Sequence, residues 1–245
     1  MGGVFGIARK RDCVEELFYG TDYLSHLGTK RGGLAVSGPS GFVWKIHKLE
    51  SSYFRTQLEP NLPDLSGNIG IGAISDTDAQ PLPFTSHLGS FCIACVGRIA
   101  NCEELTAKAA ETGCCFSGAS NGMIRPTEVV AMLLSAEKSF EEGIKSVQEK
   151  IKGSCSFLVL TAKGIYACRD RLGRTPLVIG RKEDGFAVSS ESSAFQNLGY
   201  DPVRDLGPGE AVYISPEGCE TRIMPGDTMQ VCTFLWVYYG YPSSN

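Results

Sequence analysis

The chain has 245 residues, 42% of them hydrophobic and 20% charged, which is enough apolar material for one large domain with a full core. Its formal net charge is -4 and its pI is near 5.5, so it lacks the basic field that gathers nucleic acid or anionic lipid. No apolar run approaches the roughly 20 residues that a membrane-spanning helix needs. Composition therefore argues against nucleic acid and membrane as partners and favours a small molecule or another protein.

The ten cysteines do not form the pattern of a disulfide framework or a zinc site. Cys92 and Cys95 make one CxxC pair and Cys114 and Cys115 lie further on, whereas zinc sites normally use two such pairs or added histidines. The three histidines are scattered, and no secretory signal pattern stands at the start. We expect reduced cysteines, a cytoplasmic setting, and no metal or other cofactor.

The N-terminal segment predicts a strand followed by a helix. Residues 3–8 are apolar almost throughout, which suits burial on both faces of a sheet. Apolar side chains then recur at near-helical spacing over residues 13–26. Asp12 stands where it can cap this helix, and Gly28 stands where it can end it.

The remainder of the chain alternates between strand and helix patterns. A hairpin is predicted from residues 33–36 and 41–46, around the turn residues 37–40. Further strands are predicted at residues 69–74, 90–96, 155–161, 164–170, 177–181, 185–189 and 211–215. Helices are predicted at residues 102–112, 127–135 and 139–151. Strands at both ends with helices between them indicate an α+β domain of two stacked sheets covered by helices.

One segment carries a specific resemblance. Residues 164–212 contain RDRLGRTPL, in which Asp170 and Arg171 precede Gly173 at a strand end, and then SSESSAF, whose hydroxyl and carboxylate groups suit a neighbouring turn. This stretch resembles the class II glutamine amidotransferase domain of amidophosphoribosyltransferases. Weaker similarity extends over nearly the whole chain. The resemblance implies an N-terminal nucleophile hydrolase fold, a four-layer α-β-β-α sandwich.

The resemblance also implies a domain boundary and a partner. Residues 1–235 correspond to the glutaminase-type domain, and residues 236–245 to a tail or to the start of a link toward an absent phosphoribosyltransferase-like domain. A protein partner of that kind, a small-molecule ligand and a homo-oligomer all stay open.

In this family, removal of Met1 exposes a cysteine whose thiolate attacks the amide of glutamine. Here the nucleophile position holds Gly2, which has neither sulfur nor hydroxyl. The family's oxyanion hole comes from an Asn-Gly pair, but this chain has Val96 before Gly97, so one donor is lost. Losing such a donor typically costs about a hundred- to a thousandfold in rate.

The groups that would hold the ends of glutamine are also replaced. Ser75, followed by Asp76, stands where the family has the arginine that binds the substrate carboxylate. Pro126 stands where an acidic residue receives the substrate ammonium. In the family's H-R-G-Q segment the chain keeps His26 but has Leu27 in place of arginine.

These replacements predict a degenerate pocket and a non-catalytic scaffold, partner-binding or ligand-sensing module, without a catalytic residue. The alternative is an amide hydrolase that uses a rearranged site, for which Cys95 is the candidate thiol. Asp76, Arg98 and Arg125 would lie near the pocket and allow a different ligand. The clusters at residues 9–11 and 30–31 have the pattern of ordinary solvated charge.

Overall fold

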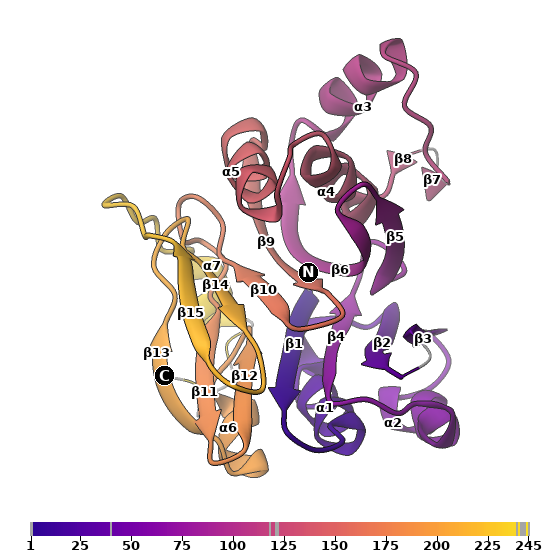
Figure 1. Cartoon of the computed structure of the whole chain (residues 1–245), viewed down its shortest axis with the longest axis vertical. Helices are drawn as coiled ribbons and strands as arrows, with labels where there is room; N and C mark the ends of the chain where they lie inside the picture. Colours follow the sequence, from indigo (N-terminus) through magenta and orange to yellow (C-terminus); the bar gives the residue numbers. More distant parts are fainter. Residues whose placement is uncertain are drawn as a thin grey trace.

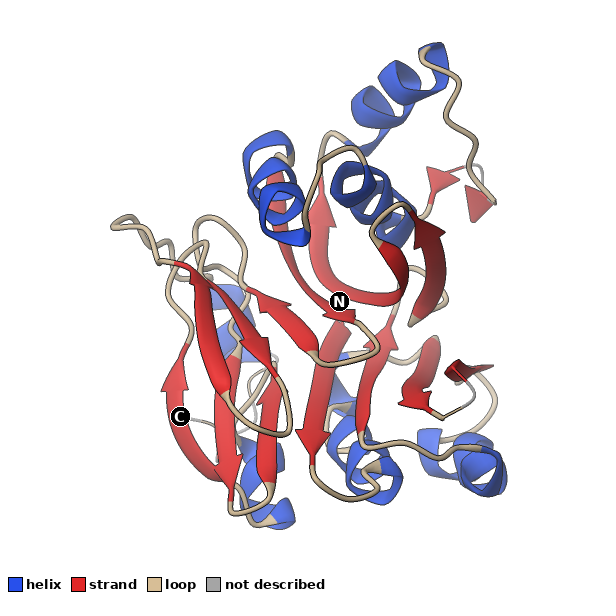
Figure 2. Ribbon diagram, viewed as in Figure 1, coloured by secondary structure: helices blue, strands red, loops and turns tan. Residues whose placement is uncertain are grey.

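The computed structural model describes residues 2–39, 41–117, 119–120, 123–238, 240 and 244. Two antiparallel sheets face each other, and helices cover their outer faces (Figures 1 and 2). This is the predicted α+β sandwich. No helix in the described part of the chain is long and apolar enough to span a membrane.

The first sheet has seven strands in the order β13-β11-β12-β1-β4-β2-β3. Their bounds are β1 (Gly2–Arg9), β2 (Arg31–Gly38), β3 (Gly41–Lys48), β4 (Ile69–Ser75), β11 (Val178–Lys182), β12 (Gly185–Ser189) and β13 (Asp201–Asp205). The second strand of the chain's hairpin, β3, forms one edge, and β13 forms the other. The N-terminal strand lies at the centre, between β4 and β12, because its apolar residues can be buried on both faces.

The second sheet has six strands in the order β15-β14-β10-β9-β6-β5. Their bounds are β5 (Leu82–Ser86), β6 (Gly89–Ile99), β9 (Gly153–Leu160), β10 (Ile165–Cys168), β14 (Ala211–Ile214) and β15 (Cys219–Ile223). A separate two-stranded ladder joins β7 (Ala119–Ser120) to β8 (Met123–Ile124).

Two groups of helices form the outer layers. The first sheet is covered by α1 (Val14–Asp22), α2 (Phe54–Leu58) and α6 (Ser193–Leu198), with 3-10 turns at Ser25–Leu27 and Glu59–Asp64. The second sheet is covered by α4 (Pro126–Ser135) and α5 (Phe140–Lys150), and α3 (Cys102–Glu111) packs beside α4. A last helix, α7 (Thr233–Tyr238), follows the strands. The predicted domain boundary at residue 235 stays a prediction, and residues 239, 241–243 and 245 of the predicted tail lie outside the described part.

Strand alternation assigns each side chain of the first sheet to one of two cores. Val4 and Ala8 of β1 pack with Leu158 of β9 in the core between the sheets. Phe5 and Ile7 pack under the helices of the first sheet. Residues of even number in β1 therefore face the second sheet, and residues of odd number face the helices.

The predicted elements are present, with shifted ends. The first helix was predicted to reach residue 26 but ends at Asp22, because the chain tightens into the 3-10 turn that starts at Ser25. The N-cap residue is Cys13 and not the predicted Asp12, and Cys13 makes no side-chain cap hydrogen bond. Asp12 precedes it, and its Oδ1 atom accepts from the Val14 amide at 2.9 Å. The strand β13 was not predicted because all five of its residues are exposed and no alternation marks it. Only its pairing with β11 makes it a strand.

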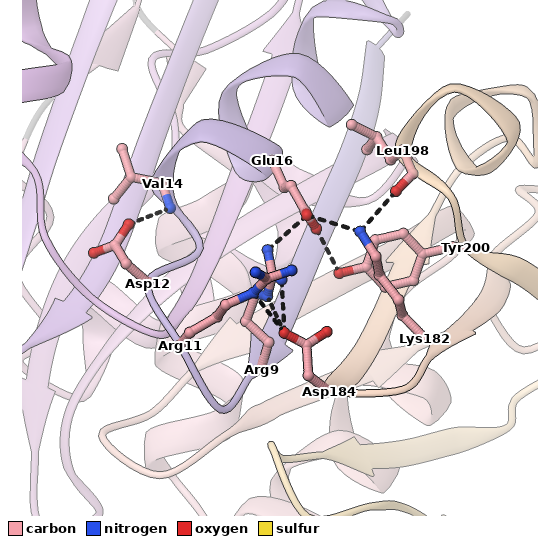
Figure 3. A network of polar contacts seen from close by, with 9 residues as sticks. All are labelled: Arg9, Arg11, Asp12, Val14, Glu16, Lys182, Asp184, Leu198 and Tyr200. Carbon is pink, nitrogen blue, oxygen red and sulfur yellow. Dashed lines mark hydrogen bonds and ion pairs between the residues drawn. The ribbon is translucent and has the colours of Figure 1, made fainter.

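The prediction of solvated charge at residues 9–11 is wrong for Arg9, which is 3% exposed. Its guanidinium contacts Glu16 of α1 at 2.6 Å and Asp184 of the β11–β12 turn at 2.7 Å (Figure 3). Arg11, which is 68% exposed, contacts the same Asp184 carboxylate. Arg9 is buried because the chain brings two carboxylates to it.

The same network extends to the second half of the chain. The Lys182 ammonium donates to Glu16 at 2.9 Å and to the Leu198 carbonyl at 3.0 Å, and the Tyr200 hydroxyl donates to Glu16 at 2.9 Å (Figure 3). These bonds join β1, α1, β11 and the end of α6. At this end of β1 the buried charges are paired.

Candidate functional site

Gly2, the residue predicted at the nucleophile position, lies in a row that crosses three neighbouring strands. Gly2 of β1 pairs with Ser75 of β4, and Ser75 pairs with Arg31 of β2. Paired residues project from the same face of a sheet, and for Gly2 that face looks toward the second sheet. The start of β1 lies at the centre of the molecule, where β1 meets the second sheet (Figure 1). We call this row with the adjoining turn residues 76–78 the Gly2 site.

Position 2 has little room for a side chain. A Cβ atom added to Gly2 would lie 2.5 Å from the Ile74 carbonyl oxygen, a separation that real Cβ atoms essentially never show. The contact is with backbone, so either β1 or β4 would have to shift. The local backbone therefore fits glycine and not cysteine.

Ser75 serves its own turn. Its Oγ atom accepts hydrogen bonds from the amides of Thr77 at 3.1 Å and Asp78 at 3.2 Å. The side chain is 2% exposed. Ser75 thus closes the turn after β4, a role that an arginine could not fill.

Asp76 ties this turn to the segment after the first helix. The Thr29 amide donates to its Oδ1 atom at 2.8 Å. Burial raises the pKa of Asp76, but the Thr29 hydrogen bond and the positive charges near the carboxylate outweigh it, so its pKa lies below the ordinary value. Asp76 is a carboxylate at neutral pH and has a structural partner.

Leu27 and His26 lie near this turn but on different sides. Leu27 is buried with Leu24 and Ile74 in the core under the helices, not in the space between the sheets. The His26 ring contacts the Glu191 carboxylate at 3.0 Å through Nε2 and the Tyr23 carbonyl at 3.1 Å through Nδ1. Leu27, which the resemblance aligns with the family's arginine, is thus part of an apolar core.

The predicted oxyanion residues lie at the end of β6. Val96 is buried in the core between the sheets. Gly97 has a φ of 121°, and a Cβ there would collide with the Ser154 carbonyl oxygen, so only glycine fits. The turn thus requires glycine at position 97, and the residue before it is an apolar side chain of the core.

Pro126 is the first residue of α4, where its missing N–H costs nothing. The carboxylate at this helix start comes from Asp78 instead, whose Oδ2 atom accepts from the Thr127 hydroxyl at 2.9 Å. Burial raises the pKa of Asp78 to about 6, although the hydrogen bonds from Thr127 act in the opposite direction. Its Oδ1 atom is buried and has no hydrogen-bond partner among the described residues.

Cys95, the candidate thiol for a rearranged site, faces away from the Gly2 site. It packs in the core under α4 and α5, whereas Cys92 faces the other sheet, as the odd spacing predicts. A hydrogen bond with Cys155, together with burial, raises the pKa of Cys95 well above the ordinary thiol value. Cys95 is therefore a buried neutral thiol. Among the described residues no three His, Cys, Asp or Glu side chains are grouped to hold a metal ion.

Two residues of the Gly2 site were missed from the sequence. Arg31 was assigned to a solvated cluster, which is wrong for this residue, because it is partly buried and its Nη1 atom is fully buried. Asp78 was not singled out, because nothing local shows that it meets Thr127, 49 residues later. The predicted hairpin could have placed Arg31 on a strand, but not beside Ser75. Of the other predicted pocket residues, Arg98 is exposed and Arg125 is partly buried.

The fold and the strand-end motifs define a class II glutamine amidotransferase domain. A family model described as glutamine amidotransferase domain matches residues 69–197, more than half of the chain, and the chain belongs to this family. Within it, the chain is homologous to the glutaminase domain of amidophosphoribosyltransferases.

Similar proteins carry that name. The amidophosphoribosyltransferase of Bacillus subtilis is 28% identical over 99% of this chain and 52% of its own length. That of Mycobacterium tuberculosis is 28% identical over 99% of this chain and 48% of its length. That of Methanocaldococcus jannaschii is 32% identical over 87% of this chain and 47% of its length. The chain spans about half the length of these relatives.

The structural comparison gives the same result. The Bacillus subtilis glutamine phosphoribosylpyrophosphate amidotransferase, solved with ADP and GMP, superposes with a TM-score of 0.89 at 26% identity over 99% of this chain and 54% of that one. A structure described as the allosteric regulatory enzyme of purine biosynthesis superposes with a TM-score of 0.88 at 26% identity, over 99% of this chain and 53% of that one. The N-terminal nucleophile hydrolase sandwich implied by the resemblance is thereby confirmed.

Proposed function

We propose that this glutaminase-type domain has lost glutamine hydrolysis and acts as a non-catalytic module that binds a partner or a ligand in the cytoplasm. The main support is Gly2, because class II chemistry needs a nucleophile there and a Cβ at this position would meet the Ile74 carbonyl at 2.5 Å. Ser75, Val96 and Leu27 support the proposal further, since each makes structural contacts where the family has a catalytic or substrate-binding group.

The alternative, an amide hydrolase with a rearranged site, would need another nucleophile. Cys95 is the candidate thiol, but it is buried, faces α4 and α5, and has a raised pKa. A thiol in that state is protonated at neutral pH and a poor nucleophile. The structure therefore gives this alternative little support.

The proposal is tested by measuring ammonia release from L-glutamine by the purified chain, with an active class II glutaminase assayed in parallel. We expect a rate equal to that of a protein-free control, and no covalent labelling by an electrophilic glutamine analogue in intact-mass spectra. Release well above the control, abolished in Cys95→Ser, would establish the rearranged site instead.

Restoring the missing thiol sharpens this test. Gly2→Cys returns the family's residue but places its Cβ against the Ile74 carbonyl, and Ser75 and Val96 still lack the family's donors. We expect Gly2→Cys to stay inactive, with Gly2→Ala as the matched control for the steric effect alone. Ammonia release from Gly2→Cys but not from Gly2→Ala would show that only the nucleophile has been lost.

A protein partner is supported by the segment after β15. Met224, Met229, Val231 and Val237 are each about half exposed or more, and clusters of exposed apolar side chains mark interaction surfaces. The relatives are amidophosphoribosyltransferases about twice as long as the chain, so the proposed partner is a phosphoribosyltransferase-like domain. Hydrogen–deuterium exchange with and without such a domain from the same organism should show protection over residues 224–237. Protection confined to other surfaces would contradict this assignment.

A further inference from the structure

Arg31 has an unusual position for a charged residue in a sheet. It is the first residue of β2, and it pairs with Ser75 on one side and with Lys48 of β3 on the other. Arg31 and Lys48 form no ion pair with a described residue, since neither occurs among the salt bridges of the described chain. Like charges directly opposite each other destabilise a strand pair, so packing alone does not explain this arrangement.

The direction of the Arg31 side chain follows from its neighbours on β2. A Cβ added to Gly33 would lie 2.5 Å from the Gln80 carbonyl oxygen, on the side of the second sheet, and Ala35 belongs to the core between the sheets. Gly32, between Arg31 and Gly33, faces Phe54 in the helix layer. Arg31 therefore projects from the same face as Gly33 and Ala35, toward the second sheet.

The guanidinium has an unsatisfied donor there. Its Nη1 atom is buried and has no hydrogen-bond partner among the described residues. A buried donor of a charged group without a partner is costly, and native structures rarely keep one without a role. By contrast, each polar contact of Ser75 and Asp76 given above is with the protein itself.

We propose that Arg31 anchors a binding site for the carboxylate of a small molecule, on the face of β2 that Arg31 shares with Gly33 and Ala35 and beside Ser75 of β4. Cross-strand neighbours have Cβ atoms about 5 Å apart, so the Arg31 side chain can reach over Ser75. A planar guanidinium binds a carboxylate through two parallel hydrogen bonds, and Lys48 adds a second positive charge to the same row. The cation contributed by β4 in the family is here contributed by β2.

This inference deepens the proposed function, because it names the class of ligand that the same site binds. The binding itself does not depend on the loss of hydrolysis, but the role of the bound molecule as a ligand and not a substrate rests on the proposed function. Binding and hydrolysis are measured separately, so either proposal can fail alone. Glutamine hydrolysis would contradict the proposed function, and carboxylate binding that does not change in the Arg31 variants would contradict this inference.

The test is calorimetric titration of the purified chain with four probes. L-glutamine carries a carboxylate and an ammonium, glutarate carries carboxylates alone, L-glutaminamide lacks the carboxylate, and inorganic phosphate is a tetrahedral anion. We expect binding of L-glutamine, glutarate or both, and no binding of L-glutaminamide or phosphate at the same concentrations. The proposal would be overturned if neither L-glutamine nor glutarate bound, or if L-glutaminamide or phosphate bound as tightly as the carboxylates.

Variants of Arg31 locate the binding. In Arg31→Gln the dissociation constant of the bound carboxylate should rise about tenfold or more, and Arg31→Lys should recover part of the loss through its charge. Lys30→Gln is the matched control, since it removes the same charge from the adjacent, exposed residue. Unchanged binding in both Arg31 variants, or an equal loss in Lys30→Gln, would contradict the assignment. If Arg31→Gln fails to fold, Arg31→Lys against Lys30→Gln decides the question.

Discussion

The two ends of β1 differ in how their charged groups are satisfied. At the Arg9 end, Glu16 and Asp184 pair with the guanidinium, and Lys182 and Tyr200 complete the network (Figure 3). At the Gly2 end, Arg31 Nη1 and Asp78 Oδ1 are buried without hydrogen-bond partners among the described residues. The buried charges at the Arg9 end are paired with other side chains and stabilise the fold. A buried polar group without a partner lowers the stability of the fold and marks a place where another role is expected.

The largest effect is expected at the paired end. Arg9→Met should lower the free energy of unfolding by about 3 kcal/mol, because it leaves Glu16 and Asp184 without their buried partner, and removing one member of a buried pair is strongly destabilising. Urea unfolding measures this change. Arg11→Gln, which removes an exposed contact to the same Asp184, should change stability by less than about 0.5 kcal/mol. Equal losses of unfolding free energy in Arg9→Met and Arg11→Gln would mean that the burial of Arg9 adds nothing to the strength of its ion pairs.

Asp78 at the other end should destabilise the fold as it ionises. Its pKa in the folded protein, about 6, is above the ordinary 3.8, so the cost is absent below about pH 4 and complete above about pH 6. That difference corresponds to roughly 3 kcal/mol at neutral pH. Asp78→Asn cannot ionise and should be more stable than the wild type at pH 7, by about 2 kcal/mol, with little or no gain at pH 4.

Unfolding free energies of both proteins at several pH values between 4 and 7 measure this effect. The matched control is Asp64→Asn, because the Asp64 carboxylate is 59% exposed. A stability difference between Asp78→Asn and the wild type that stays constant with pH would show that the Asp78 carboxyl is not under strain.

A smaller effect separates the hydroxyl of Tyr200 from its ring. Tyr200→Phe keeps the packing with Phe195 but removes the hydrogen bond to Glu16, and should cost about 1 kcal/mol. Tyr53→Phe is the control, because Tyr53 is 87% exposed and its change should be near zero. If Tyr200→Phe is as stable as the wild type, the network does not extend beyond Lys182.

The smallest effect tests the unpaired end directly. Arg31→Met removes a buried donor that has no partner among the described residues, so without ligand it should leave stability unchanged or raise it by about 0.5 kcal/mol. The measurement is the urea midpoint without added carboxylate. A loss of stability comparable to that of Arg9→Met would erase the difference between the two ends of β1 and assign Arg31 a structural role.

Much of the fold could be predicted from the sequence, because its signals are local. The apolar run at residues 3–8, the helical periodicity after Asp12 and the RDRLGRTPL motif each identify an element or a turn within a few residues. The strand β13 could not be predicted, since its five exposed residues carry no alternation. Its conformation comes from pairing with β11.

The candidate site was predictable only in part. Gly2, Ser75 and Val96 could be picked out because the resemblance aligns them with positions of known chemistry, and the consequence, loss of hydrolysis, stays a prediction. The sequence by itself determined the order of strands and helices and the absence of a thiol at position 2. Tertiary structure alone decided which charges are buried and which are paired.

Arg9 and Arg31 illustrate the reason. Both occur in short basic clusters that have the same pattern in the sequence, yet Arg9 meets a carboxylate 175 residues away. Arg31 meets a serine on another strand and no carboxylate among the described residues. The free energy of a charge depends on its distance from other charges and from water, and both distances are set by which strands become neighbours.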